Sequence, residues 1–207
     1  MSTLDKNWSE QILHFWFDEL SEQDWFSFSP KIDALIMSRF QMMSKIIFES
    51  SLETLDITRQ GQMHERSHIQ ALAAIIALDQ FPRNLYRKQS AAFAYDEKAL
   101  EILHFILNQK SNLDQMFKSL KLSDEMLKNH KKFLLMPLLH SEKLSDQELE
   151  LEVFAKEIND ETQNMYVRKH YEIIKKFNRF PHRNEVLNRP NTAQEIEYLK
   201  NSDRFGQ

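Results

Sequence analysis

Two short stretches that lie far apart in the chain combine side chains that proteins use to hold anions. Residues 78–84 read LDQFPRN and residues 178–184 read NRFPHRN. Each places a Phe-Pro pair close before an arginine and an asparagine. Arginine presents a planar fork of N–H donors that matches a carboxylate or a phosphate, and asparagine adds an amide donor. If the fold brings the two stretches together, these donors would bind an anionic small molecule or a peptide carboxylate.

The prolines also predict where two helices end. A residue before proline is disfavoured in the helical conformation, so helices are expected to end near Phe81 and near Phe180. Helix C-termini carry partial negative charge, and Asp79 would add a carboxylate to such an end. Asp79 therefore needs a cation or a hydrogen-bond donor, and Arg83 or Arg183 would supply a bidentate partner.

The two motifs allow a structural and a functional interpretation, and the sequence leaves both open. In the structural one, arginine and asparagine side chains cap helix carbonyls, and the charges are simply paired. In the functional one, both helix ends face one cleft that holds the ligand. The candidate ligand-binding residues are Asp79, Arg83, Asn84, His140, His170, His182, Arg183 and Asn184.

Two histidines raise the question of catalysis. His140 follows Pro137, which is expected to break or kink a helix, and His170 lies ten residues before Phe180. Each is either a hydrogen-bonded structural residue or a general base in the same cleft. Glu142 and His140 are two apart and would point to different faces of a helix, so no metal site is expected there. The catalytic residues stay unknown, and no cofactor is expected.

Residues 64–68, HERSH, match the H-E-x-x-H pattern of zinc peptidases, in which two histidines on one helix face bind the metal. Gly61 and its polar neighbours place His64 at a frayed helix start rather than in a rigid interior. The Gly and His that would continue the longer metzincin pattern are absent after His68. A zinc metallopeptidase is therefore kept only as a remote alternative.

Composition points to one helical domain. The chain has 207 residues, 42% of them hydrophobic, which suffices for one core, so residues 1–207 are expected to form a single domain. Only 2 residues are glycine, whereas β-architectures and phosphate-binding loops use glycine freely. Helical periodicity recurs throughout, and the expected fold is all-α with about eight helices.

Individual helices can also be predicted. Residues 68–81 are apolar nearly all round and are expected at the centre of the fold. Residues 162–180 have the pattern of a long amphipathic helix that stops before proline. Residues suited to helix N-caps are Asn7, Ser29, Asp96, Ser123, Ser145 and Thr192.

Charge and cysteine content limit the partners. The net charge of −4 is spread over interspersed acidic and basic residues, so nucleic acid is not an expected partner. No apolar run approaches the roughly 20 residues that span a bilayer, so no membrane contact is expected either. The start MSTLDKNWSEQ lacks an export signal and the chain has no cysteine, which together predict a cytoplasmic protein. The oligomeric state stays unknown.

Several stretches carry a resemblance to a known family. ALAAIIALDQFPRNLYR, FLLMPLLHSEKLSDQE and HYEIIKKFNRFPHRNEVLNR resemble the signatures of a bacterial family of uncharacterised proteins, a domain of unknown function. The resemblance runs from ILHFWF to EIEYL and implies a tetratricopeptide-like all-α array of helical hairpins, but no activity. The family positions that carry over are Asp79, Gln80, Arg83, Asn84, His140, Glu142, His170, His182, Arg183 and Asn184.

The chain departs from the family pattern at a few positions. Asn178 and Asn188 stand where glycine is usual, and asparagine is the best substitute for glycine in a left-handed turn, so both turns are expected to form. Leu139 replaces a common glutamate before His140, which further weakens a metal site there. The HERSH stretch has no counterpart in the family, which counts against the peptidase.

Three classes of function follow. The first is a protein that binds an anionic metabolite or peptide carboxylate through Arg83, Arg183 and His182. The second is an enzyme that uses a histidine beside those arginines as general base. The third is a tetratricopeptide-like interaction module whose groove takes an extended peptide or a partner helix.

Overall fold

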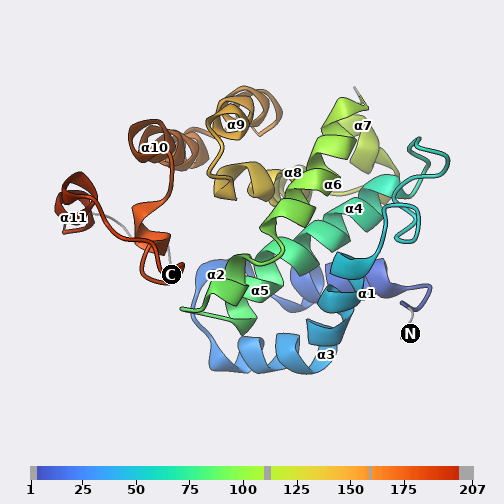
Figure 1. Ribbon diagram of the computed structural model, residues 1–207. Coiled ribbons are helices and arrows are strands. Elements are labelled where there is room, and N and C mark those ends of the chain that lie inside the picture. The colour runs from blue at the N-terminus through green and yellow to red at the C-terminus, as the bar shows by residue number, and fades with distance from the viewer. Residues whose placement is uncertain (1–3, 110–112, 159, 201–207) are drawn as a thin grey trace.

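The computed structural model describes residues 4–109, 113–158 and 160–200, and the regular elements in these ranges are helices (Figure 1). The all-α prediction is confirmed. Within the same ranges the β-type contact is an isolated bridge between Arg59 and Gln62. In chain order the elements are α1 (Trp8–His14), η1 (Phe15–Glu19), α2 (Glu22–Phe26), α3 (Pro30–Glu49), α4 (Ser67–Ile75), η2 (Ile76–Gln80), α5 (Phe81–Leu85), η3 (Ser90–Phe93), α6 (Asp96–Asn108), α7 (Leu113–Phe117), η4 (Lys118–Leu120), α8 (Asp124–His140), α9 (Leu144–Glu157), α10 (Glu161–Phe177), η5 (Pro181–Arg183) and α11 (Ala193–Leu199).

Short helices account for the difference from the roughly eight that were expected. The helices α2, α5 and α7 have 5 residues each, which is too few for a periodic pattern to be visible in the sequence. Two further segments, η1 and η2, are π-helical turns that continue α1 and α4 directly. Among the described helices, none is long and apolar enough to cross a membrane.

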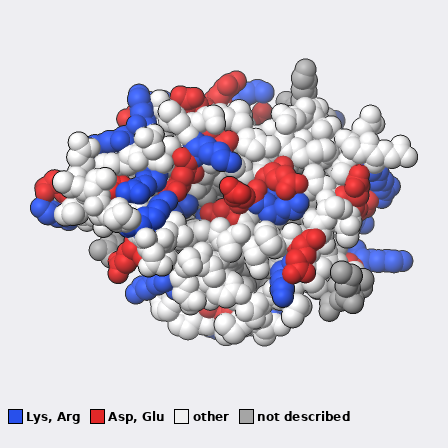
Figure 2. Space-filling view, viewed as in Figure 1, with Lys and Arg blue, Asp and Glu red and all other residues white. Residues whose placement is uncertain are grey.

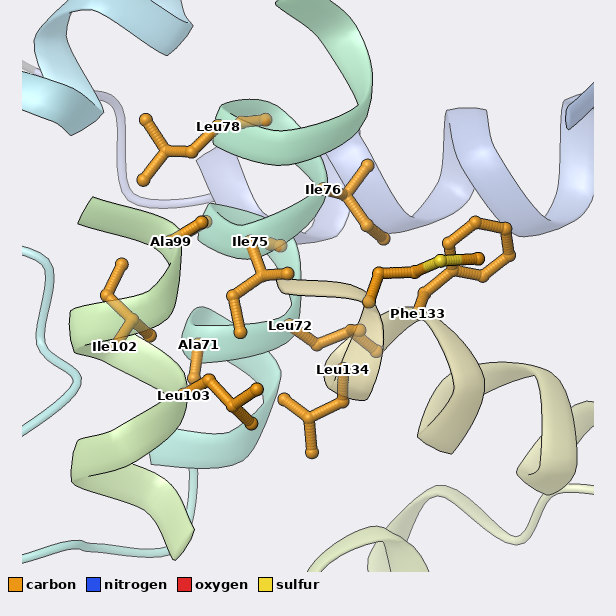
Figure 3. Packing of buried hydrophobic residues seen from close by; sticks show 14 of the residues in the cluster. Ala71, Leu72, Ile75, Ile76, Leu78, Ala99, Ile102, Leu103, Phe133 and Leu134 are labelled. Carbon is orange, nitrogen blue, oxygen red and sulfur yellow. The ribbon is translucent and has the colours of Figure 1, made fainter. Parts of the chain in front are cut away.

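The centre of the fold is α4 with its continuation η2, as the sequence predicted. Residues 71–78 are fully buried, and α4 packs against α1, α6 and α8. Figure 3 shows Leu72 and Ile75 of α4 among side chains of α6 and α8, including Leu103 and Leu134. Fully burying an aliphatic side chain of this size contributes about 1.5–3 kcal/mol. The helix that leads into the first Phe-Pro motif is therefore fixed by the core.

The C-terminal helices form a smaller unit beside this bundle (Figure 1). Helix α9 packs against α8 on one side and α10 on the other, in the manner of consecutive helical hairpins. Ile173, Ile174 and Phe180 form a separate apolar cluster with Phe177 and Tyr198. The tetratricopeptide-like arrangement of the whole chain remains an expectation, since the helices before α8 pack around α4 rather than in sequence.

Helix starts were predicted with mixed success. The hydroxyl groups of Ser29, Ser123 and Thr192 accept hydrogen bonds from backbone N–H groups, as N-caps do. Ser145 does not cap a helix, because α9 begins one residue earlier, at Leu144, and Asp96 does not cap one either, because it is the first residue of α6. Asn7 directly precedes α1, but its side chain makes no capping hydrogen bond. The N-terminus of α9 instead forms directly after the turn that follows α8.

The chain stays helical at two positions where a break was predicted, Phe81 and Pro137; at Pro137 the prediction was a break or a kink. Helix α8 continues through Pro137 to His140, and Gln147 donates hydrogen bonds to the carbonyl groups of Leu138, Leu139 and Ser141 at its end. These bonds satisfy carbonyls that lack partners at a helix C-terminus.

The chain also stays helical at Phe81, with φ −58° and ψ −40°. The π-helical turn η2 precedes Pro82, which then lies in the first turn of α5, where a missing N–H costs nothing. The prediction of a helix end at Phe81 was therefore wrong.

The second motif does follow a helix end. Helix α10 stops at Phe177, three residues earlier than expected, and Asn178 closes it in the left-handed region with φ 56°. Phe180 is extended, with φ −87° and ψ 107°, before Pro181. Asn188 also has a positive φ, of 53°, so both asparagines adopt the conformation that the sequence predicted for them.

These asparagines provide a test of the C-terminal turns. We expect Asn178→Ala to lower the free energy of unfolding by about 1 kcal/mol, because a Cβ without a compensating polar group is unfavourable at positive φ. Asn178→Gly should change it by less than about 0.5 kcal/mol. Urea unfolding at neutral pH measures both, with Arg168→Ala on the exposed face of α10 as control. Equal losses for alanine and glycine would contradict the account of this turn.

Candidate functional site

The two Phe-Pro motifs meet at Asp96 and Phe93. Arg83 of α5 donates from Nη1 and Nη2 to Oδ1 and Oδ2 of Asp96, at 2.8 and 2.9 Å. Arg183 of η5 approaches the same carboxylate, with Nη1 3.8 Å from Oδ2. The guanidinium carbons of Arg83 and Arg183 lie 5.6 and 4.6 Å from the centre of the Phe93 ring. One carboxylate and one aromatic ring thus join arginines from remote parts of the chain.

Arg83 is paired with two carboxylates, although its Nε is buried and, like that of Arg183, has no acceptor in the described part of the chain. Besides the bidentate pair with Asp96, its Nη1 donates to the backbone carbonyl of Asp79 and lies 3.4 Å from the Asp79 carboxylate. Burial opposes the charge, but Asp79 and then Asp96 outweigh burial and raise the pKa of Arg83 above its ordinary value. The contacts of Arg83 favour the structural interpretation for this residue.

Arg183 is buried and much less completely paired. Its guanidinium lies between two rings, 4.6 Å from the centre of Phe93 and 4.6 Å from the centre of Phe180. Nη1 donates to the carbonyl of His140 at 3.1 Å, whereas Nε is buried and has no acceptor in the described part of the chain. Burial and then Arg83 lower the pKa of Arg183 to about 10, although Asp96 acts in the opposite direction.

A second pair of charges lies under the arginines. Asp79, on the π-helical turn η2, is fully buried, and Nδ1 of His140 lies 2.8 and 2.9 Å from its two carboxylate oxygens. The side-chain amide of Gln80 also donates to this carboxylate. Burial alone would raise the pKa of Asp79, but Arg83 and then His140 hold it below its ordinary value. Asp79 is therefore an ionised carboxylate inside the core.

The contact with Asp79 fixes the state of the His140 ring. An ionised carboxylate only accepts hydrogen bonds, so Nδ1 carries the proton and Nε2 keeps a lone pair. The side chain retains 16% of its surface exposed, and within the described ranges Nε2 has no hydrogen-bond partner. Burial and then Arg83 lower the pKa of His140, against the effect of Asp79. His140 is thus a neutral imidazole at pH 7 with an open acceptor nitrogen.

The other two predicted histidines flank the Phe180 ring. The ring of His170 lies edge-on at 5.5 Å from it, and the ring of His182 lies 5.4 Å away. His170 also bonds through Nδ1 to the carbonyl of Tyr166, one turn earlier in α10. Burial lowers the pKa of His170 to about 4 and that of His182 to about 3, so both are neutral.

The asparagines of the two motifs bind elsewhere. Asn84 donates to Asp33 of α3 at 2.9 Å, outside the arginine cluster. Asn184 is fully buried and donates to Asn191 at 2.7 Å, while it accepts from Nε of Arg189 at 3.0 Å. Asn84 thus links α5 to α3, and Asn184 holds its own loop in place.

Sequence reasoning missed the residues that join the motifs. Asp96 starts α6, and neither it nor Phe93 has a pattern that indicates a partner remote in the chain. Glu142 was expected on a helix, but α8 ends at His140, and Glu142 lies in the turn that follows. There it accepts from the backbone N–H of Phe180 at 2.8 Å and pairs with both terminal nitrogens of Arg189, at 2.6 and 2.9 Å.

The HERSH stretch does not have the geometry that the peptidase pattern requires. Helix α4 begins at Ser67, so His64 lies outside it, and Nε2 of His64 bonds to the carbonyl of Asp56 at 2.6 Å. His68 is buried, with its ring edge-on to Phe117 at 5.5 Å. In the described ranges, no three His, Asp or Glu side chains group in a way that would hold a metal ion.

A hollow of about 200 Å³ lies between η1, α2 and the first turns of α8. Its lining includes Phe17, Trp25, Met126 and Asn129. His140 is at the opposite end of α8, about 20 Å away at 1.5 Å per residue. This hollow is therefore separate from the arginine cluster.

Comparisons with known proteins identify a family but no activity. Residues 12–203 match the model of a family described as bacterial protein of unknown function (DUF924). A solved structure of a protein of unknown function from Agrobacterium tumefaciens is similar, with a TM-score of 0.75 and 22% identity over 94% of this chain and 97% of that one. This similarity concerns the fold alone. No curated protein matches the chain.

The buried histidines predict a loss of stability in acid. Burial lowers the pKa of His68 and of His170 to about 4, whereas an unfolded histidine titrates near 6.5. The unfolded chain therefore takes up protons first, so stability that is present above pH 6.5 is lost as the pH falls towards 4. Between pH 7.5 and pH 5 each histidine should cost about 2 kcal/mol, measured by urea unfolding.

The variant His68→Leu should remove about 2 kcal/mol of this pH dependence. Its control is His14→Gln, because the side chain of His14 is 65% exposed. A stability that is flat between pH 7.5 and pH 5, or a slope unchanged in His68→Leu, would contradict the buried neutral state.

Proposed function

The chain belongs to the DUF924 family of bacterial proteins of unknown function, and on that premise we propose that it binds an anionic small molecule or the carboxylate of a peptide through Arg183. The observation that carries the proposal is the incomplete pairing of this guanidinium. It is 6% exposed, makes one hydrogen bond through Nη1, and has no acceptor for Nε among the described residues.

A buried cation is costly unless it is paired and hydrogen-bonded. The carboxylate nearest to Arg183 is Asp96, but Asp96 already accepts two hydrogen bonds from Arg83. Arg83 itself repels the charge of Arg183, which is part of the reason why the pKa of Arg183 is low. A bound anion would relieve both deficits, because it would accept from the guanidinium and offset its charge.

The surroundings favour a carboxylate over a phosphate. Asp96 and Glu142 lie close to Arg183, and although Arg83 and Arg189 pair with them, they oppose a second negative charge. A carboxylate brings one negative charge, which a single arginine balances, whereas a phosphate brings nearly two. The rings of Phe93 and Phe180 fix the plane of the guanidinium and so favour a planar, bidentate ligand.

Local contacts rather than a general field would hold the ligand. On the face shown in Figure 2, the acidic and basic side chains of the described residues are interspersed, without a broad area of one sign. Affinity would therefore depend on Arg183 and on the neutral donors and acceptors of His140 and His182 around it.

Thermal shift measurements with small carboxylates test this function. Acetate, propionate and benzoate, which carry one carboxylate each, are compared with phosphate and with chloride at equal ionic strength. A carboxylate with a Kd of about 1 mM would stabilise the protein by about 2.7 kcal/mol at 100 mM, or roughly 5–10 °C in Tm. We expect this shift in the wild type, a smaller one in Arg183→Lys and none in Arg183→Met.

The matched control is Arg179→Met, which removes an arginine that pairs with Glu195 instead. It should keep the full shift. The proposed function is refuted if carboxylates raise Tm no more than chloride does, or if Arg183→Met responds as the wild type does.

A further inference from the structure

We propose that Asp79 and His140 form a proton-transfer dyad in which Nε2 of His140 acts as general base on a water molecule beside the ligand of Arg183. The site would then hydrolyse a small acyl compound that carries a carboxylate. This inference rests on the proposed function in one respect, since Arg183 must hold the carboxylate of the substrate.

The geometry resembles what a general base requires. The Asp79 carboxylate is fully buried and accepts a hydrogen bond from Nδ1–H of His140, with an N···O distance of 2.8 Å. This bond orients the ring. The nitrogen that faces away from Asp79 is an open acceptor on a partly exposed ring. An ionised partner on Nδ1 stabilises the imidazolium that forms when Nε2 takes a proton. Asp79 also lies on a π-helical turn, a feature that is frequent at functional sites.

Other buried histidines of the chain lack this arrangement. His130 and His170 bond through Nδ1 to the carbonyl groups of Met126 and Tyr166, each one turn earlier in its own helix, as structural histidines do. A buried aspartate would be satisfied by an arginine and an amide alone, and Asp79 already has Arg83 and Gln80. The need to pair Asp79 therefore does not explain why His140 also contacts this carboxylate.

The contacts of His140 also indicate which nucleophile it would activate. The chain has no cysteine, and in the described ranges no serine or threonine hydroxyl bonds to Nε2 of His140. The nearest hydroxyl in sequence, that of Ser141, donates to Asp146 instead. The contacts of His140 therefore provide no side-chain nucleophile that could form a covalent intermediate. The nucleophile that His140 would activate is water.

The reaction needs no reactant other than water and the acyl substrate, because His140 returns the proton that it takes up. Nε2 takes a proton from water while the water oxygen forms a bond to the acyl carbon of the substrate. The bond from that carbon to the leaving amine or alcohol then breaks, and the leaving group takes the proton from Nε2. The products are a carboxylic acid and the amine or alcohol, and His140 returns to its neutral state.

The dyad is tested first without any ligand. Diethyl pyrocarbonate acylates unprotonated imidazole nitrogens, and mass spectrometry of peptides gives the rate at each histidine. We expect His140 to react faster than His170, and Asp79→Asn to slow its reaction roughly tenfold, since the carboxylate raises the basicity of Nε2. The control is Asp56→Asn, which removes the carboxylate that pairs with His64 and should leave the rate at His140 unchanged.

A second measurement avoids variants that could fail to fold. In ¹⁵N NMR spectra of the wild type, His140 should show the neutral form with the proton on Nδ1. A proton on Nε2, or a His140 that labels no faster than His170, overturns the dyad. The same holds if Asp79→Asn folds and labels at the wild-type rate.

Hydrolysis of the p-nitrophenyl monoester of succinate, which carries a carboxylate, is then compared with that of neutral p-nitrophenyl acetate. The wild type should prefer the succinate ester. His140→Gln should lower kcat by about 10²-fold or more with little change in KM, and Arg183→Met should mainly raise KM. Equal rates for wild type and His140→Gln overturn the catalytic proposal, while carboxylate binding in thermal shift would still support the proposed function.

Discussion

The carboxylate of Asp79 is the constraint on which the rest of the site depends. It is fully buried, on the helix that forms the centre of the core, where an unpaired charge would be severely destabilising. Arg83 and His140 are its charged and polar partners. These partners come from α5 and from the C-terminal end of α8. The pairing of one buried carboxylate therefore helps to position two further helices.

A chain of charges leads outward from this carboxylate to the C-terminal helices. Arg83 contacts the Asp79 carboxylate and forms a bidentate ion pair with Asp96. Oδ2 of Asp96 in turn lies 3.8 Å from Nη1 of Arg183. In the same region, the Glu142 carboxylate accepts a hydrogen bond from the backbone N–H of Phe180. The small C-terminal unit is therefore attached to the main bundle by polar contacts as well as by α9, and the candidate site lies at this junction.

Much of the scaffold was readable from local sequence, because helical periodicity and turn chemistry are local properties. The all-α fold, the buried helix over residues 68–81 and the left-handed turns at Asn178 and Asn188 were predicted in this way. The prediction failed where tertiary contacts decide. Phe81 stays helical because the π-helical turn η2 ends directly before it, and Pro82 lies in the first turn of the short helix α5, which begins at Phe81.

The site itself was only partly accessible to sequence reasoning. Similar motifs suggested similar roles. Arg83, however, forms a bidentate ion pair with Asp96, whereas Arg183 has no such carboxylate partner and is incompletely paired. Asn84 donates to Asp33 of α3, whereas Asn184 donates to Asn191 in its own loop. Such differences depend on which carboxylates the fold brings near, and no spacing in the chain encodes that.

A carboxyl ¹³C NMR titration of Asp79 tests the central claim most directly. If Arg83 and His140 outweigh burial, the Asp79 resonance should stay at its ionised position from pH 7 down to the lowest pH at which the protein remains folded. A midpoint above about 5 would contradict the account, because it would mean that burial dominates and that the carboxyl group is neutral. The orientation of His140 and the chain of charges to Arg183 would then lose their basis.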